Sequence, residues 1–179
     1  MADYVRTGIG IAQIYTMEGD YNKALKYSTR SLKISKNIDY KIGMILSYYS
    51  IGYINYNKNE YRLAKELLLK SLTIQKGIGL TIIALETRAS LYLTYKQTGE
   101  KYDENEIHTL IKKTENIEFD LNYRLYELLE DTSYLETSYT QVQELADNLE
   151  PDVKAKFLGY PIPKAIIEEW KKMNNPTSL

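Results

Sequence analysis

Apolar residues in the first forty positions form two groups with helical spacing, separated by a short polar segment, residues 17–20. The apolar positions are Ile9, Ile11, Ala12 and Tyr15, followed by Ala24, Leu25, Tyr27, Leu32 and Ile34. This spacing predicts two helices joined by a tight turn. Gly19 suits the end of the first helix because glycine adopts a left-handed conformation at no steric cost, and Asp20 can cap the second helix through its carboxylate.

The same pattern recurs along the chain at an offset of 40 residues. Residues 19–34 reappear as residues 59–74, and a second segment, residues 36–40, recurs as residues 76–80 and 115–119. A period of about 20 to 50 residues is typical of stacked units that cannot bury an apolar face alone. The sequence therefore predicts an all-α solenoid of antiparallel helix pairs, with three clear repeats and a degenerate fourth. The repeats are expected at about residues 1–39, 40–79, 80–118 and 119–150.

The turns between repeats contain residue types that tolerate a positive φ after a helix. These are Asn37, Gly77 and Asn116, and an isoleucine follows each of them. We expect all three to adopt a positive φ and each isoleucine to pack back on the helix just ended. Within the helices, Ala12 and Gly52 occupy matched positions, so we expect two helices to approach closely there.

The segment of residues 151–173 predicts a cap of short helices. Pro151 fits the first position of a short helix, and a terminal helix is expected to open near Pro161 or Pro163. Terminal units of a solenoid must cover an exposed core edge, so we expect residues 1–179 to form one domain that includes this cap. No similar cap is evident at the amino-terminal end, which favours a longer protein or pairing of this end with another copy.

The repeated residues resemble the tetratricopeptide repeat family, whose paired helices carry small and aromatic residues at fixed places. In the first copy these places are held by Ile11, Ala12, Tyr15, Gly19, Tyr21, Ala24 and Ser31. In the second copy Asn55 replaces an aromatic, and the matching residues are Ile51, Gly52, Tyr61, Ala64 and Ser71. The resemblance implies a right-handed solenoid that binds proteins or peptides. The usual period is about 34 residues, so this chain is similar to the longer variety found in bacterial regulators.

Charge and cysteine content disfavour several classes of protein. The chain has 23 basic and 24 acidic residues and a net charge of -1, so no field of one sign would attract nucleic acid or anionic lipid. The absence of Cys removes disulfides and thiol catalysis and suits a reducing compartment. No apolar run is long enough for a signal peptide or a membrane helix. We therefore expect a cytoplasmic protein without nucleic-acid or membrane partners.

The first helices of such repeats line the concave surface, so their outward positions predict a binding groove. These positions are Arg6, Ile9, Gln13, Thr16, Tyr49, Tyr53, Tyr56, Glu86, Ala89, Leu93 and Lys96. The three tyrosines share one helical face, and tyrosine offers apolar area with a polar tip. The alternative is that half of these rings only pack between helices. Ile9, Gln13 and Ser50 stand where carboxylate-clamping repeats carry Lys, Asn and Arg, so we expect no such clamp.

The sequence offers little for catalysis or for a bound cofactor. His108 is the only histidine, and its polar neighbours favour a solvated position on a helix. A single histidine without cysteines cannot build a zinc site, and no glycine-rich phosphate loop is present. We therefore expect no enzyme activity, no metal and no cofactor.

These observations together predict a non-enzymatic protein-interaction scaffold. The first hypothesis is the carboxy-terminal regulatory or sensing region of a larger bacterial signalling protein, whose protein or peptide ligand the sequence does not identify. The second is a receptor for a small signalling peptide. The third is a homodimerisation module that pairs through the amino-terminal repeat, with an interface of about 1,200 to 2,000 Å².

Overall fold

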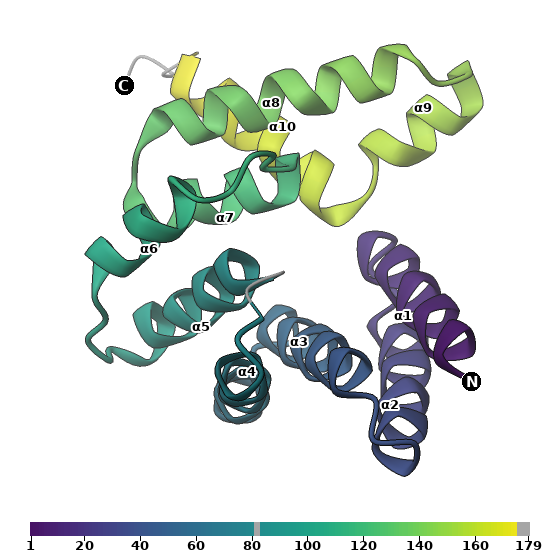
Figure 1. The fold of residues 1–179 in the computed structure, drawn as a ribbon. Helices are drawn as coiled ribbons and strands as arrows, with labels where there is room; N and C mark the ends of the chain where they lie inside the picture. Colours follow the sequence, from purple (N-terminus) through teal and green to yellow (C-terminus); the bar gives the residue numbers. More distant parts are fainter. Residues whose placement is uncertain (81–82, 175–179) are drawn as a thin grey trace. The chain divides into compact units, whose positions relative to one another are not determined.

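The computed structural model describes residues 1–80 and 83–174, and all the regular secondary structure in these ranges is α-helical. The helices are α1 (Ala2–Met17), α2 (Tyr21–Asn37), α3 (Lys41–Asn57), α4 (Tyr61–Gly77), α5 (Ala84–Thr98), α6 (Glu104–Ile111), α7 (Phe119–Leu129), α8 (Thr132–Asp147), α9 (Pro151–Leu158) and α10 (Pro161–Asn174). They form two compact units, Met1–Lys113 and Thr114–Leu179. Figure 1 shows the first unit in purple to teal and the second in green to yellow.

Helices of the first unit pack in chain order, each against the next, from α1 to α6. The second pair reproduces the first at the predicted offset, since α2 begins at Tyr21 and α4 at Tyr61. The predicted all-α fold of adjacent helix pairs is confirmed. A single array over residues 1–179, with the repeat boundaries given above, stays a prediction.

The turn inside each repeat has the same geometry in all three copies. Gly19, Asn59 and Gly99 have φ values of 79°, 62° and 72°. The next backbone N–H then returns to the preceding helix, as in the bond of 2.9 Å from Asp20 N to Tyr15 O. Asp20 also accepts a hydrogen bond of 3.1 Å from Lys23 N, so its predicted capping role is confirmed.

The turns between repeats differ from the expectation. The positive φ values lie at Asp39 (50°) and Gly79 (65°), two residues after Asn37 and Gly77, and Asn116 does not share them. Both helices continue through the residue at which the turn was expected. The turn is closed further along the chain, where the backbone N–H of Tyr40, for example, donates to Ser35 O at 2.8 Å. The isoleucines that follow, Ile38 and Ile78, are exposed rather than packed. The prediction for these turns was therefore wrong.

Close approach of the paired helices depends on small residues, as expected at Gly52. A Cβ atom on Gly52 would lie 2.8 Å from Leu68 Cγ, which α4 brings against α3. Serine hydroxyls join the same helix pairs: Ser31 Oγ donates to Val5 O at 3.3 Å, and Ser71 Oγ donates to Ile45 O at 3.0 Å. These two bonds are 40 residues apart, so the repeat extends to its buried polar contacts.

The second unit encloses a core of its own. The buried residues are Phe119, Leu135, Val142, Ala146, Phe157 and Ile166. Helix α10 packs on α7, α8 and α9, and Trp170 stacks on Tyr139 with ring centroids 4.9 Å apart. The terminal helix begins at Pro161, one of the two predicted positions, and Pro151 begins α9 as expected.

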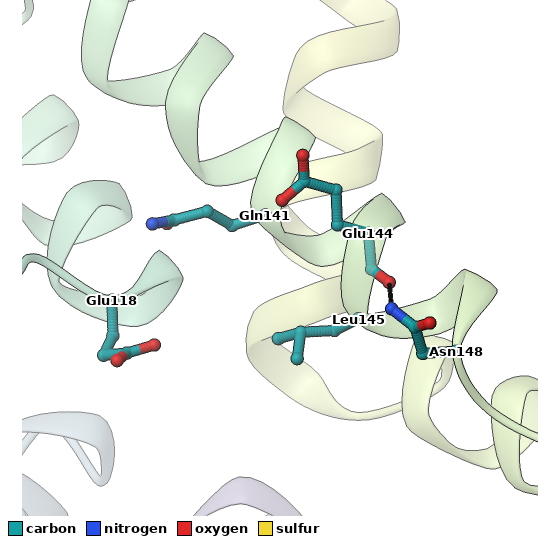
Figure 2. A pocket seen from close by; sticks show the side chains of 5 residues that line it. All are labelled: Glu118, Gln141, Glu144, Leu145 and Asn148. Atoms are coloured by element: carbon teal, nitrogen blue, oxygen red, sulfur yellow. Dashed lines mark hydrogen bonds between the residues drawn. The ribbon is translucent and has the colours of Figure 1, made fainter.

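A shallow hollow opens on this second unit (Figure 2). It is lined by Glu118, Gln141, Glu144, Leu145 and Asn148. Gln141 donates to Ile117 O at 2.9 Å and accepts from Asn122 at 3.0 Å, while Asn148 donates to Glu144 O at 2.7 Å. The amide of Gln141 therefore joins α8 to α7 and to the segment before α7, and the amide of Asn148 bonds within α8. Both amides are bound within the unit and are not directed at a ligand.

Candidate protein-binding surface

The first helices of the three repeats are neighbours, because α1 contacts α3 and α3 contacts α5. They carry all eleven residues predicted to line a groove, and we call the side of these helices on which those residues lie the first-helix surface. The turn before α3 is closed by the hydrogen bond from Tyr40 N to Ser35 O, which fixes the start of this helix relative to α2.

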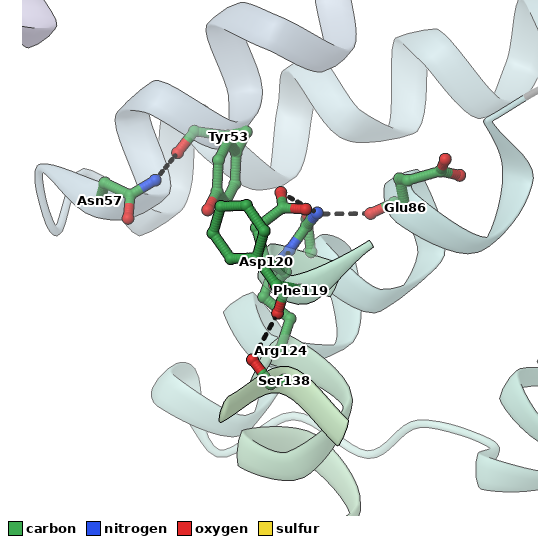
Figure 3. Close-up of polar contacts among 8 residues, drawn as sticks. Tyr53, Asn57, Glu86, Phe119, Asp120, Arg124 and Ser138 are labelled. Carbon is green, nitrogen blue, oxygen red and sulfur yellow. Dashed lines mark hydrogen bonds and ion pairs between the residues drawn. The ribbon is translucent and has the colours of Figure 1, made fainter. Parts of the chain in front are cut away.

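Helix α3 supplies the aromatic part of the first-helix surface. Tyr49 and Tyr53 stack nearly parallel, with centroids 6.1 Å apart and an interplanar angle of 5°, and Tyr56 contacts Tyr61 of α4. Asn57 donates to Tyr53 O at 2.8 Å (Figure 3). Tyr49 and Tyr56 are half-buried, whereas Tyr53 is only 9% exposed. The structure thus brings the three predicted tyrosines onto one helix face with different exposures.

Helix α1 adds polar residues to the same surface. Arg6 and Gln13 are exposed, and Thr16 is half-buried and donates to Ala12 O at 2.8 Å. Arg6 Nε donates to Tyr40 Oη at 3.2 Å, and this hydrogen bond raises the pKa of the guanidinium. Ile9 is buried, so contacts with a partner would fall to its exposed neighbours.

Helix α5 adds accessible residues to the first-helix surface mainly near its two ends. Lys96 is exposed and Glu86 is half-buried, whereas Ala89 and Leu93 lie in the interior. Of the predicted residues, Ile9, Ala89 and Leu93 are therefore the ones least accessible to a partner.

A partly buried polar cluster that the sequence did not indicate joins α5 to α6. Arg88 forms an ion pair of 2.7 Å with Glu106, and the Tyr92 hydroxyl donates to the same carboxylate. Tyr102 stacks on Tyr92 with centroids 5.0 Å apart. Burial and then the hydrogen bond to Glu106 raise the pKa of Tyr92 to about 12. Arg88 and Tyr92 stand four residues apart, a spacing that could have suggested a shared face.

A second polar contact joins α4 to the turn after α5. Lys65 pairs with Glu100 and lies 5.3 Å from the centroid of the Tyr95 ring. Their hydrogen bond raises the pKa of Lys65 and lowers the pKa of Glu100. Both side chains remain partly exposed, so this pair orients α5 more than it stabilises the fold.

In the second unit, α7 makes polar contacts within itself and with α8. Arg124 Nη2 pairs with Asp120 at 3.0 Å, and Ser138 Oγ of α8 donates to Phe119 O at 2.7 Å (Figure 3). Within the described part of the chain, no group of three His, Cys, Asp or Glu residues is placed to hold a metal ion.

The part of the chain that contains the repeated turns and the repeated serine hydrogen bonds is similar to a known family. The tetratricopeptide repeat family matches residues 5–77, which span most of α1 and all of α2 to α4. The match supports the resemblance to this family over residues 5–77. Tetratricopeptide repeats mediate protein–protein interaction and form a non-catalytic fold.

Comparison of the chain with curated proteins and with solved structures gives no match. Among residues 1–80 and 83–174, no helix combines the length and the apolar character needed to cross a membrane.

Proposed function

We propose that this tetratricopeptide repeat chain is a non-enzymatic scaffold that binds a protein partner along its first-helix surface. The observation that carries the proposal is the stack of Tyr49 on Tyr53, on the middle of three neighbouring first helices. Aromatic residues of this kind are enriched where proteins bind proteins, because a ring offers large apolar area at a small cost in side-chain entropy.

The chemistry of this surface favours an extended peptide or an amphipathic helix with apolar side chains. Its charged positions are few and of mixed sign, namely Arg6, Glu86 and Lys96, so ion pairs would add little specificity. A partner would therefore be held by apolar anchors against the half-buried rings of Tyr49 and Tyr56.

Within this proposal, the partner-binding region serves as a regulatory or sensing part of a larger, cytoplasmic bacterial signalling protein. The support is the resemblance of the 40-residue period to the longer repeats of bacterial regulators. A receptor for a small signalling peptide would use the same tyrosines, whereas homodimerisation would use the outer side of α1.

The test uses a peptide that is selected for binding to the full chain. Short peptides from a random display library are selected on the full chain, and the affinity of the best synthetic peptide is measured by calorimetry. Tyr49→Ala and Tyr56→Ala should each weaken binding about tenfold or more, because each removes a half-buried anchor. Tyr53 is less suitable, because truncating a largely buried ring also lowers stability.

Tyr134→Ala, on α8 of the other unit, is the matched control and should bind as the wild type does. Far-UV circular dichroism checks that each variant keeps its helices. Peptides that bind the Tyr49→Ala, Tyr56→Ala double variant with unchanged affinity would remove the first-helix surface from the proposal.

A further inference from the structure

Helix α1 carries exposed apolar residues, and the ring of one of them, Tyr4, also lies 5.0 Å from the Arg30 guanidinium of α2. Ile14 is 57% exposed, and Tyr4 and Met17 are also exposed. Ile11 and Gly10 are half-buried, and a Cβ atom on Gly10 would meet nothing within 4 Å. An apolar helix face of this kind is costly to leave in water and is typical of a contact site.

The repeat period identifies what normally covers this face. We call five residues of α1 its outer face: Tyr4, Thr7, Gly10, Ile11 and Ile14. Forty residues later, their counterparts in α3 are Met44, Ser47, Ser50, Ile51 and Ile54, and all five are buried. Ile54, for example, is 0% exposed, whereas Ile14, its counterpart in α1, is 57% exposed.

In the second repeat the covering element is α2, the second helix of the preceding repeat. Ser50 Oγ lies 2.8 Å from Ser28 Oγ of α2, and both are buried. Leu32 of α2 shares a core cluster with Met44 and Ile51. This face of α3 therefore receives both the polar and the apolar residues of one side of α2.

The third repeat follows the same arrangement with α4 as the covering helix. Thr87, the counterpart of Ser47, is buried and accepts a hydrogen bond of 3.2 Å from Gln75 of α4. Two successive copies thus meet the second helix of the preceding repeat at this face.

We propose that the outer face of α1 binds an amphipathic helix of a partner protein that has the chemistry of α2. Such a helix presents a small polar residue opposite Gly10 and a leucine beside Tyr4 and Ile11, as Ser28 and Leu32 do toward α3. This site lies apart from the tyrosines of the first-helix surface, so it does not depend on the function proposed above.

The test uses the sequence of α2 itself as the probe. A fluorescein-labelled peptide of residues 21–37 is titrated with the full chain, and binding is followed by fluorescence anisotropy. We expect saturable binding that Ile14→Lys weakens about tenfold or more, since a charge on this apolar face must be desolvated. Gly10→Ser should tighten binding several-fold, because it restores the hydroxyl that Ser50 supplies in α3.

Three controls accompany these variants. Leu63→Lys changes another exposed apolar residue, 44% exposed on α4, and should bind the peptide as the wild type does. A peptide with Ser28→Lys and Leu32→Lys should not bind, because it lacks the side chains that pack on α3. The Tyr49→Ala, Tyr56→Ala double variant should bind the peptide normally, which separates this site from the first-helix surface.

Three results would overturn the proposal. The folded chain could show no saturable binding, or Ile14→Lys could bind the peptide as tightly as the wild type. Sedimentation equilibrium could instead show a dimer that Ile14→Lys dissociates, and the occupant of the face would then be a second copy of this chain.

Discussion

At the scale of single residues, the surroundings of Tyr92 raise the pKa of its hydroxyl well above the ordinary value. Its ring is buried, and its hydroxyl donates to Glu106, which also pairs with Arg88. Both burial and this hydrogen bond favour the neutral phenol, so the pKa of Tyr92 rises to about 12. The hydrogen bond that joins Tyr92 to α6 is therefore lost when alkaline pH removes the phenol proton.

Replacing Tyr92 with Phe should show this coupling. The folded chain keeps the phenol proton up to about pH 12, whereas the unfolded chain releases it above about pH 10. The hydroxyl thus stabilises the fold below pH 10, and this contribution is lost as the pH rises through 12. At neutral pH Tyr92→Phe should lower the free energy of unfolding by about 1 kcal/mol.

Urea unfolding of both proteins, repeated from neutral to alkaline pH, measures the difference. It should shrink between pH 10 and pH 12, where the wild type loses stability faster than Tyr92→Phe. Two curves that stay parallel over this range would contradict the prediction.

At the scale of helices and turns, the hydrogen bond that closes a turn decides which residue takes the left-handed conformation. Gly77 and Gly79 differ in this respect: Gly77 is the last residue of α4, whereas Gly79 has a φ of 65°. A Cβ atom at either position would meet nothing within 4 Å, so the two sites differ in backbone conformation and not in packing.

Gly79→Ala should therefore lower the free energy of unfolding by about 1 kcal/mol, because alanine disfavours a positive φ. Gly77→Ala should leave it unchanged or raise it slightly, because alanine is favoured over glycine in a helix. Chemical denaturation of the two variants and the wild type measures both effects. Equal destabilisation by both substitutions would contradict the turn geometry.

Much of the fold could be predicted because the repeat places matching residues at equal intervals. The offset of 40 located α1 to α4 and the turns at Gly19 and Asn59. The turns after α2 and α4 were misplaced because Asn and Gly only permit a positive φ, while the returning N–H of Tyr40 or Leu80 selects the residue.

The candidate surface was predictable to a smaller extent. Helical spacing grouped Tyr49, Tyr53 and Tyr56 on one face, but it could not separate the half-buried rings from the largely buried one. The cluster around Glu106 was missed because α6 departs from the repeat period, so no earlier copy showed which residues Arg88 and Tyr92 would meet.

At the scale of the whole molecule, the chain consists of two compact units, each with buried apolar residues of its own. Trp170 is the only tryptophan, and it stacks on Tyr139 inside the second unit. Its fluorescence therefore reports on that unit alone, whereas circular dichroism reports on the helices of both.

The second unit is the smaller one, and a smaller unit buries a smaller fraction of its surface on folding. Urea unfolding followed by Trp170 fluorescence should therefore have a lower midpoint than unfolding followed by circular dichroism. Coincident midpoints would show that the two units unfold together.

The agreement between α1 and α3 over 40 residues has a consequence for protein engineering. A gene in which the codons for residues 1–40 are duplicated in tandem would place a second α2 immediately before the original α1. That helix would find Gly10, Ile11 and Ile14 in the positions that Ser50, Ile51 and Ile54 hold against the natural α2. The chain thus contains its own template for elongation, and an array lengthened in this way should gain one helix pair per inserted copy.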